Sequence, residues 1–600
     1  MNVVKNYISL VLCIVCSLLI SYRILTGPMD KAISWDVFGY YLYLPAIFYE
    51  HDPELKDIQF AEDARVRYGL SETLYQIHEM QTGRRVIQYT CGYAIITSPA
   101  FFAGHVAASV TNSQQDGFSK PYQRAMVIWV LCIAMIGLFY VRKILLLFFS
   151  DTLSAVLILI LVAGTNYFIQ TTLNLTSQHT VLFTVHAVLI YHLIRWSILE
   201  RGRDLVIVAL MFGLACLVRP TELILILLVF FWGHSGFKTA IKGWWDMIKS
   251  RPLLITGAVL VVVLCAVPQF LYWKLATGSF ITNSYANPGE GLDFHRPHLF
   301  SFLFSFRKGW LIYTPIMILA IAGLVISFRT HRKLFLSALL FTCVYVYTAS
   351  CWSTWWYAGS FSQRSMVQAY PFFIILCGIT INYALKKPRL RIIVPTSTTL
   401  FIALNLFQSW QYEHNIIDSS RMTRDAYFSV FLQTHKPPNQ DQLLVVDRGA
   451  SGIPTNNYPR KYHTKNLARC DFDTLTNGIK SMAVDEEFHT LAMIPYKKIT
   501  SGEHCWVEVE ALIFCDSVLT DEFLLVANLD HNGIYGYTTK GFADGEFISG
   551  QWNKLHLSYL TPPVRNPSDK VAIYIWKRKK IEVLIDYASV DALILNDESE

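Results

Sequence analysis

Repeated apolar runs most constrain what this chain can fold into. They recur between residues 7 and 410, and the sequence beyond residue 410 contains none. A helix needs about 20 mostly apolar residues to cross the hydrocarbon core of a bilayer. The 600-residue chain is 53% hydrophobic and only 16% charged, and membrane flanks rather than nucleic acid explain its net charge of +7. The sequence therefore predicts a polytopic α-helical membrane domain over residues 1–410.

Lysine and arginine positions predict how the chain crosses the membrane, because short cytoplasmic loops retain these residues and translocated loops largely do not. Five basic clusters are assigned to the cytoplasmic side: residues 142–143, 195–203, 238–251, 329–333 and 386–391. The first run, residues 7–25, lacks a small-residue cleavage site and is interpreted as an uncleaved anchor rather than a signal peptide. With the cytoplasmic clusters fixed in this way, the first run leaves the cytoplasm and the run before residues 142–143 returns to it, so the run at residues 89–110 between them cannot also cross. It is expected to lie at the interface or to re-enter. About 11 spans follow, with 12 or 13 as alternatives.

The residue pattern of the chain changes after the last predicted span. Residues 411–436 are interpreted as a linker and residues 437–600 as an extracytoplasmic domain. Polar and apolar residues alternate with period two at residues 506–511, 554–559 and 571–576, as in half-buried antiparallel strands. We expect a jelly-roll-like, all-β sandwich of about eight strands.

Residues 29–88 form the first outer loop, which is long for a connector and is therefore a candidate for function. Its aromatic stretch, residues 35–45, is expected to form an amphipathic helix along the membrane surface. Asp36 lies in this stretch just beyond the outer end of the first span, where partial desolvation would make it a usable general base. A helix N-cap or a solvated loop acid is the alternative for Asp36. Tyr40, in the same stretch, is a candidate binding residue.

Three arginines on predicted outer loops oppose the usual positive-inside bias, which favours anionic partners for them. Arg219 sits in an outer turn, Arg307 opens a span from the outside, and Arg364 ends a tryptophan-rich connector. They could converge on one phosphate or diphosphate, whereas each alone could instead reach lipid headgroups. In the same connector, Trp355 could stack on a sugar or anchor the chain at the bilayer boundary.

Residue types that bind metals occur at two places on the predicted outer face. Glu50, His51 and Asp52 are adjacent, although three neighbours on one loop also commonly just face water. His179 begins a span on the outer side. It could belong to a functional site or make a structural hydrogen bond. These residues establish no cofactor, and a divalent metal stays open.

The order of these features resembles the GT-C superfamily of membrane glycosyltransferases over residues 1–410. In this chain the features begin with a span, an outer loop with an early aspartate in Trp35-Asp36-Val37-Phe38-Gly39-Tyr40-Tyr41, and many further spans. They continue with an outer Arg307-Lys308-Gly309-Trp310 turn, a tryptophan-rich turn ending in Gln363-Arg364, and an outer β domain. The chain is similar in particular to the bacterial branch related to protein mannosyltransferases and aminoarabinose transferases, and to homologues of the Bacteroidetes type. It departs from the family at residues 176–179, where Thr-Ser-Gln-His stands in place of a second acidic residue, which argues against a shared metal site.

The resemblance implies an activity. A polyprenyl-phosphate-linked sugar would be the donor, Asp36 would match the first-loop catalytic aspartate, and Arg364 would match a donor-phosphate arginine. The sugar would pass, with inversion, to a glycan, lipid or protein acceptor of the cell envelope, on the outer face of a bacterial cytoplasmic membrane. The alternatives are a transporter or flippase of a lipid-linked glycan, and a non-catalytic membrane anchor whose β domain binds glycan. Charges cluster at span ends rather than at mid-membrane, which favours the enzyme.

Overall fold

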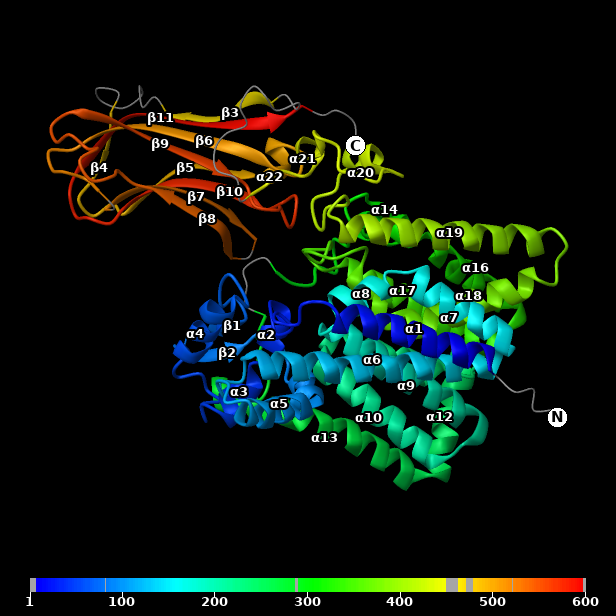
Figure 1. The fold of residues 1–600 in the computed structure, drawn as a ribbon. Coiled ribbons are helices and arrows are strands. Elements are labelled where there is room, and N and C mark those ends of the chain that lie inside the picture. The colour runs from blue at the N-terminus through cyan, green and yellow to red at the C-terminus, as the bar shows by residue number, and fades with distance from the viewer. Residues whose placement is uncertain are drawn as a thin grey trace. The chain divides into compact units, whose positions relative to one another are not determined.

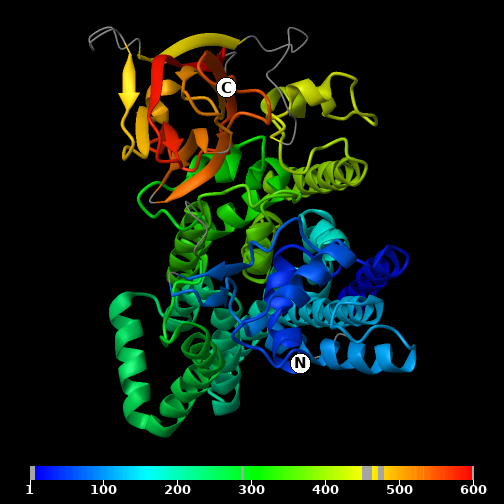
Figure 2. The same cartoon turned by 90° about the vertical axis from the view of Figure 1, so that its left-hand side faces the viewer.

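The computed structural model describes residues 7–80, 82–285, 290–448, 462–470, 479–520, 522–531 and 533–596. It consists of two compact units (Figures 1 and 2). The helical unit comprises Met1–Ala286 and Pro297–Ser420, and the β unit comprises Asn287–Arg296 and Arg421–Glu600. In Figure 1 the blue-to-green part of the chain forms helices and the small blue strands β1 and β2, and the orange and red part forms the large strands.

Helices joined by short loops build the helical unit. Its first half contains α1 (Ile8–Leu25), α2 (Asp36–Tyr41), α3 (Tyr43–Phe48), α4 (Gln59–Tyr68), β1 (Ile77–Glu79), β2 (Arg85–Ile87), α5 (Gly92–Val110), α6 (Lys120–Phe148), α7 (Asp151–Ala163), α8 (Tyr167–Leu173) and α9 (Gln178–Leu199). Its second half contains α10 (Gly202–Val218), η1 (Pro220–Ile224), α11 (Leu225–Phe231), α12 (Phe237–Ser250), α13 (Pro252–Thr277), α14 (Leu299–Phe304), α15 (Trp310–Tyr313), η2 (Pro315–Met317), α16 (Ile318–Thr330), α17 (Arg332–Ser350), η3 (Arg364–Ala369), α18 (Tyr370–Ala384) and α19 (Leu390–Glu413).

Eight helices in the described part of the chain are long and apolar enough to cross a membrane: α1, α5, α6, α9, α13, α17, η3 with α18, and α19. The bent pair of α7 and α8 would make a ninth span. The sequence predicts more because it counts three further runs, which form α10, η1 with α11, and η2 with α16. Each of these is shorter than 18 residues. The helical unit is therefore that of a multi-pass membrane protein.

Helix α5 forms from the segment expected to lie at the interface or to re-enter. It is one continuous helix with the length and composition of a span. Trp129 of α6 donates its indole N–H to the Ile96 carbonyl at 2.9 Å. Further along, Gly104 packs closely on Tyr122. These pairs place α5 antiparallel to the first half of the 29-residue α6, and its relation to the bilayer stays a prediction.

The bend between α7 and α8 holds the connector that precedes Arg364. The two helices meet at an angle of 57°. At the bend, the Asn166 amide donates to the carbonyls of Phe361 and Gln363, both at 3.2 Å. Tyr370 in turn donates its hydroxyl to Asn166 Oδ1 at 2.5 Å. The bend therefore fixes the backbone that leads directly into Arg364.

The β unit is a sandwich of two antiparallel sheets. Its strands are β3 (Tyr462–Cys470), β4 (Lys480–Met482), β5 (Phe488–Pro495), β6 (Cys505–Phe514), β7 (Phe523–Asp530), β8 (Ile534–Lys540), β9 (Trp552–Leu560), β10 (Lys570–Lys577) and β11 (Val583–Leu595). The first sheet has the order β5-β10-β7-β8, and the second has β3-β11-β6-β9 with β4 beside β11. Short helices α20 (Arg424–Val430), α21 (Gln440–Leu443) and α22 (Tyr496–Ile499) complete the unit.

Alternating side chains form the core of the sandwich. Val507, Val509 and Ile513 of β6 are fully buried, and so are Ile573 and Ile575 of β10. The three segments of period-two alternation lie in β6, β9 and β10. The described residues contain nine strands in the two sheets, against about eight expected. The predicted fold class, an α-helical membrane domain followed by an all-β domain, is confirmed.

Candidate functional site

Asp36 is the first residue of α2 and holds three partners. Its Oδ1 accepts hydrogen bonds from the hydroxyls of Tyr75 at 2.8 Å and Tyr89 at 2.9 Å. Its Oδ2 accepts from Arg364 Nη2 at 3.0 Å, in an ion pair whose carboxylate side chain is 24% exposed. Trp35, immediately before it, has φ of +53°, a strained backbone of the kind that persists at functional sites.

Two opposing effects set the pKa of Asp36. Removal from water raises it, but the Arg364 charge and the hydrogen bonds from Tyr75 and Tyr89 together lower it by more. The pKa therefore lies below its usual value, and the carboxylate is ionised at neutral pH. Desolvation alone, as expected from the sequence, would have left it a stronger base.

Lys308 holds the connector that ends in Arg364. This buried ammonium donates to the Ser360 carbonyl and, at 3.1 Å, to the Ser360 hydroxyl. Burial, with the charges of Arg364 and Arg307 nearby, holds its pKa well below its usual range. Lys308 therefore holds the connector in place before Arg364, and the sequence offered a signal for it in the outer Arg-Lys-Gly-Trp turn.

Arg219 and Tyr40 lie in the same cluster. Arg219 immediately follows α10, and its guanidinium lies 5.9 Å from the centre of the Tyr357 ring. Its charge also acts on Tyr40, whose ring stacks on Tyr89 with centroids 4.2 Å apart. Tyr89 is also a donor to Asp36, so the structure brings Arg219 and Tyr40 to the Asp36 carboxylate.

Arg307 and Trp355 stand further from Asp36. Arg307 Nε donates to the Ser420 carbonyl at 2.7 Å, and its guanidinium lies 3.9 Å from the centre of the Trp356 ring. The Trp355 ring packs against Trp356 at 6.0 Å and against His298 at 6.4 Å. Arg307 is therefore linked to the site through Lys308, its neighbour in the sequence. Trp355 lies beside Trp356 rather than on the Asp36 cluster.

The metal candidates do not converge. Glu50, His51 and Asp52 follow the end of α3, where Asp52 Oδ2 accepts from the Asp57 N–H at 3.0 Å. His179 is buried at the start of α9, close enough to Asp36 for their charges to interact. Within the described ranges, no three His, Cys, Asp or Glu side chains are grouped so that they could hold a metal ion.

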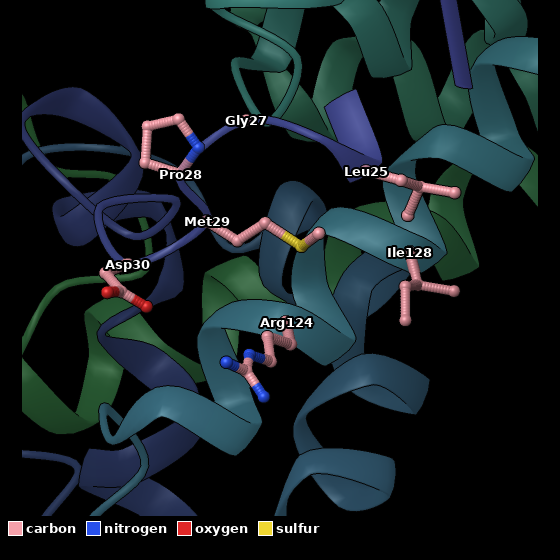
Figure 3. A pocket seen from close by; sticks show the side chains of 7 residues that line it. All are labelled: Leu25, Gly27, Pro28, Met29, Asp30, Arg124 and Ile128. Atoms are coloured by element: carbon pink, nitrogen blue, oxygen red, sulfur yellow. The ribbon is translucent and has the colours of Figure 1, made fainter. Parts of the chain in front are cut away.

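A cavity of 410 Å³ lies elsewhere in the helical unit, at the end of α1 (Figure 3). It is lined by Leu25, Gly27, Pro28, Met29, Asp30, Arg124 and Ile128. None of these residues belongs to the Asp36 cluster, so the cavity carries no part of the site.

Several residues of the site have no motif in the sequence. Tyr75 lies in the first outer loop and Tyr89 begins the apolar run after it, both without a distinctive spacing. Gln368, which contacts His179 and Glu222, and Glu222 itself lie inside or beside apolar runs. The only signal for Glu222 is a lone acidic residue in an apolar stretch, which marks a functional candidate in a membrane protein.

Comparison with known proteins gives a limited result. No family's sequence profile matches this chain, and no curated protein matches it. Two solved structures of archaeal oligosaccharyltransferase AglB from Archaeoglobus fulgidus are similar to it, one in complex with an inhibitory peptide and a dolichol-phosphate, the other in the apo form. Each is 12% identical with a TM-score of 0.38, and the match covers 76% of this chain and 62% of the AglB chain. This chain thus matches less than two thirds of the AglB chain's length, and its activity has to be inferred from the Asp36 site.

Proposed function

We propose that this protein is a membrane glycosyltransferase that moves a sugar from a polyprenyl-phosphate donor to an acceptor hydroxyl. The observation that supports this most is the Asp36–Arg364 pair at 3.0 Å, with Arg219 close by. A carboxylate among cations offers a proton acceptor and a phosphate-binding surface in one place.

The reaction assigns one task to each charge. The acceptor oxygen attacks the anomeric carbon, its proton passes to Asp36, and the bond from that carbon to the phosphate oxygen breaks. The bonding electrons leave with the lipid phosphate, whose charge Arg364 and Arg219 neutralise. Attack opposite to the leaving phosphate inverts the anomeric carbon.

Arg364 links donor binding to the strength of the base. Its Nε is buried and has no hydrogen-bond partner among the described residues, so the guanidinium has donor capacity left for a phosphate. A phosphate that draws Arg364 away would also remove the main influence that lowers the pKa of Asp36. Asp36 would then become a better proton acceptor only when the donor is present.

Donor identification tests the function. Purified full-length protein is incubated with a panel of polyprenyl-phosphate sugars and acceptor extracts, and mass spectrometry measures free lipid phosphate. We expect release with at least one donor, and its loss in Asp36→Asn. Asp116→Asn is the matched control, because Asp116 also accepts a tyrosine hydroxyl, from Tyr68 at 2.5 Å, outside the cluster. A flippase or a non-catalytic anchor would move or bind the lipid without releasing its phosphate.

We also propose that the site and the β unit lie on the outer face of a bacterial cytoplasmic membrane. The basic segments at residues 142–143 and 386–391 support this orientation. A cysteine placed at Asp544 should react in intact inner-membrane preparations with a reagent that cannot cross the bilayer, and a cysteine at Lys386 should not. Labelling at Lys386 would reverse the orientation.

A further inference from the structure

A chain of buried polar side chains leads from the Asp36 site into the helical unit. The Gln368 amide N–H donates to Glu222 Oε1 at 2.7 Å, and Gln368 Oε1 lies 2.6 Å from His179 Nδ1. His186 Nε2 lies 2.8 Å from the second Glu222 oxygen. All four residues are at most 1% exposed. Polar and ionisable groups inside a membrane protein are costly to bury, so a connected chain of them marks a candidate functional element.

Glu222, which lies between Gln368 and His186 in this chain, determines the proton position on His179. The Glu222 carboxylate, which interacts electrostatically with Arg219, only accepts hydrogen bonds. Gln368 must therefore turn its NH₂ group to Glu222 and its carbonyl oxygen to His179. Because that oxygen also only accepts, His179 carries its proton on Nδ1 and keeps a lone pair on Nε2.

The other ring nitrogen of His179, Nε2, makes only a weak contact that a substrate hydroxyl could replace. Its contact is the Gln178 amide nitrogen at 3.3 Å, a long hydrogen bond. The charges of Asp36, Arg219 and Arg364 all act on His179, so the ring borders the proposed donor site. Asp36, Arg219 and Arg364 are charged, whereas Nε2 of a neutral ring is an acceptor that can bind a neutral donor.

We propose that Glu222 and Gln368 are positioning residues that hold His179 as the Nδ1–H tautomer, and that His179 Nε2 accepts a hydrogen bond from a substrate hydroxyl. The hydroxyl belongs to the transferred sugar or to the acceptor, and the inference rests on the proposed function. This hydrogen bond orients the hydroxyl-bearing group without removing a proton, which remains the task of Asp36.

The tautomer is tested first, without any donor. Full-length protein with ¹⁵N-labelled histidine is studied by NMR in lipid vesicles, and His179 is assigned from the signals lost in His179→Phe. We expect protonated Nδ1 and unprotonated Nε2 in the wild type. Gln368→Met should give a mixture of tautomers, whereas Asp204→Asn, which removes the carboxylate beside His192 on the same helix, should leave the His179 signals unchanged. A protonated Nε2 in the wild type, or an unchanged ring in Gln368→Met, would overturn the proposal.

The hydroxyl is tested second, with the donor identified for the wild type. His179→Phe should lower turnover about 10- to 100-fold, the usual effect of losing one substrate hydrogen bond. If the hydroxyl is on the sugar, the wild type should discriminate against one deoxy-sugar donor and His179→Phe should not. If it is on the acceptor, the acceptor KM should rise while the donor KM stays constant. Identical discrimination by both proteins at every hydroxyl would remove His179 from binding. A wild type that transfers from no donor would instead refute the proposed function, with the tautomer result still standing.

Discussion

Two aspartates of the helical unit, Asp36 and Asp204, both contact an arginine, but they differ in where their partners come from. Asp204 is 1% exposed and lies 2.6 Å from His192 Nδ1 and 3.3 Å from Arg195 Nε, both on the preceding helix. Asp36 is 24% exposed, and its partners lie 39, 53 and 328 positions away in the sequence.

The difference separates a structural pair from a candidate site. The partners of Asp204 come from α9 and tie it to α10, so satisfying one buried charge explains the arrangement. Those of Asp36 come from distant segments that only the complete fold brings together, and the carboxylate stays accessible. Preorganised charges with access for a ligand are what catalysis requires. Asp204 and Arg195 therefore serve as matched controls.

The largest difference should appear when each carboxylate is made neutral. Asp36→Asn keeps the side-chain shape and should lower turnover by roughly two to four orders of magnitude, the usual contribution of a positioned base. Asp204→Asn should leave turnover per folded molecule unchanged. Lipid-phosphate release is measured by mass spectrometry and normalised to monodisperse protein. Full activity in Asp36→Asn would place Asp36 in the same class as Asp204.

The arginines should differ in donor affinity. Arg364→Ala should weaken donor binding by about 2–5 kcal/mol, the range for losing one partner of a desolvated charge pair. Arg364→Lys should recover only part of it, because the planar fork of the guanidinium is lost. Arg195→Ala, which also loses an aspartate partner, should leave the affinity unchanged. Titration with radiolabelled donor lipid measures the three affinities. An unchanged affinity in Arg364→Ala would mean that the Arg364 charge serves only as the partner of Asp36 and does not bind the donor.

The sequence predicts the fold class well because both domains repeat a simple pattern. Apolar runs are dictated by the bilayer, and period-two alternation is dictated by a sheet with one buried face. The span count is harder to predict, since α10, α11 and α16 are apolar but short. Hydrophobicity alone does not tell a short buried helix from a complete span.

The site could be predicted only in part. Asp36, Arg219 and Arg364 stand out because each is charged where the topology predicts an outer boundary. Tyr75 and Tyr89 do not, because a tyrosine near a membrane surface has an ordinary reason to be there. The pair of Asp36 with Arg364 spans 328 positions, and no local pattern encodes such a contact.

The tyrosine partners should set the pH at which Asp36 works. Hydrogen bonds to a charged group are worth about 1.5–3 kcal/mol, and those from Tyr75 and Tyr89 favour the ionised carboxylate. Tyr75→Phe or Tyr89→Phe removes one bond, so the pKa of Asp36 rises and the acid limb of the pH–rate profile moves to higher pH. Tyr68→Phe, which removes the hydroxyl that Asp116 accepts, is the control and should leave that limb in place. An unmoved limb in both test variants would mean that another group sets it.

The smallest expected effect concerns stability in acid. The folded-state pKa of Asp36 lies below its ordinary value of about 3.9, so its ionisation stabilises the folded state above that pH. This contribution is lost as the pH falls toward the folded-state pKa, because the unfolded chain then binds the proton first. The asparagine side chain of the Asp36→Asn variant cannot titrate, so the Tm advantage of the wild type over this variant should shrink between about pH 5 and pH 3. Thermal unfolding in detergent across that range measures the difference. An advantage that stays constant with pH would show that the ion pair with Arg364 does not favour ionisation of Asp36, and the distinction between Asp36 and a merely satisfied acid would lose its electrostatic basis.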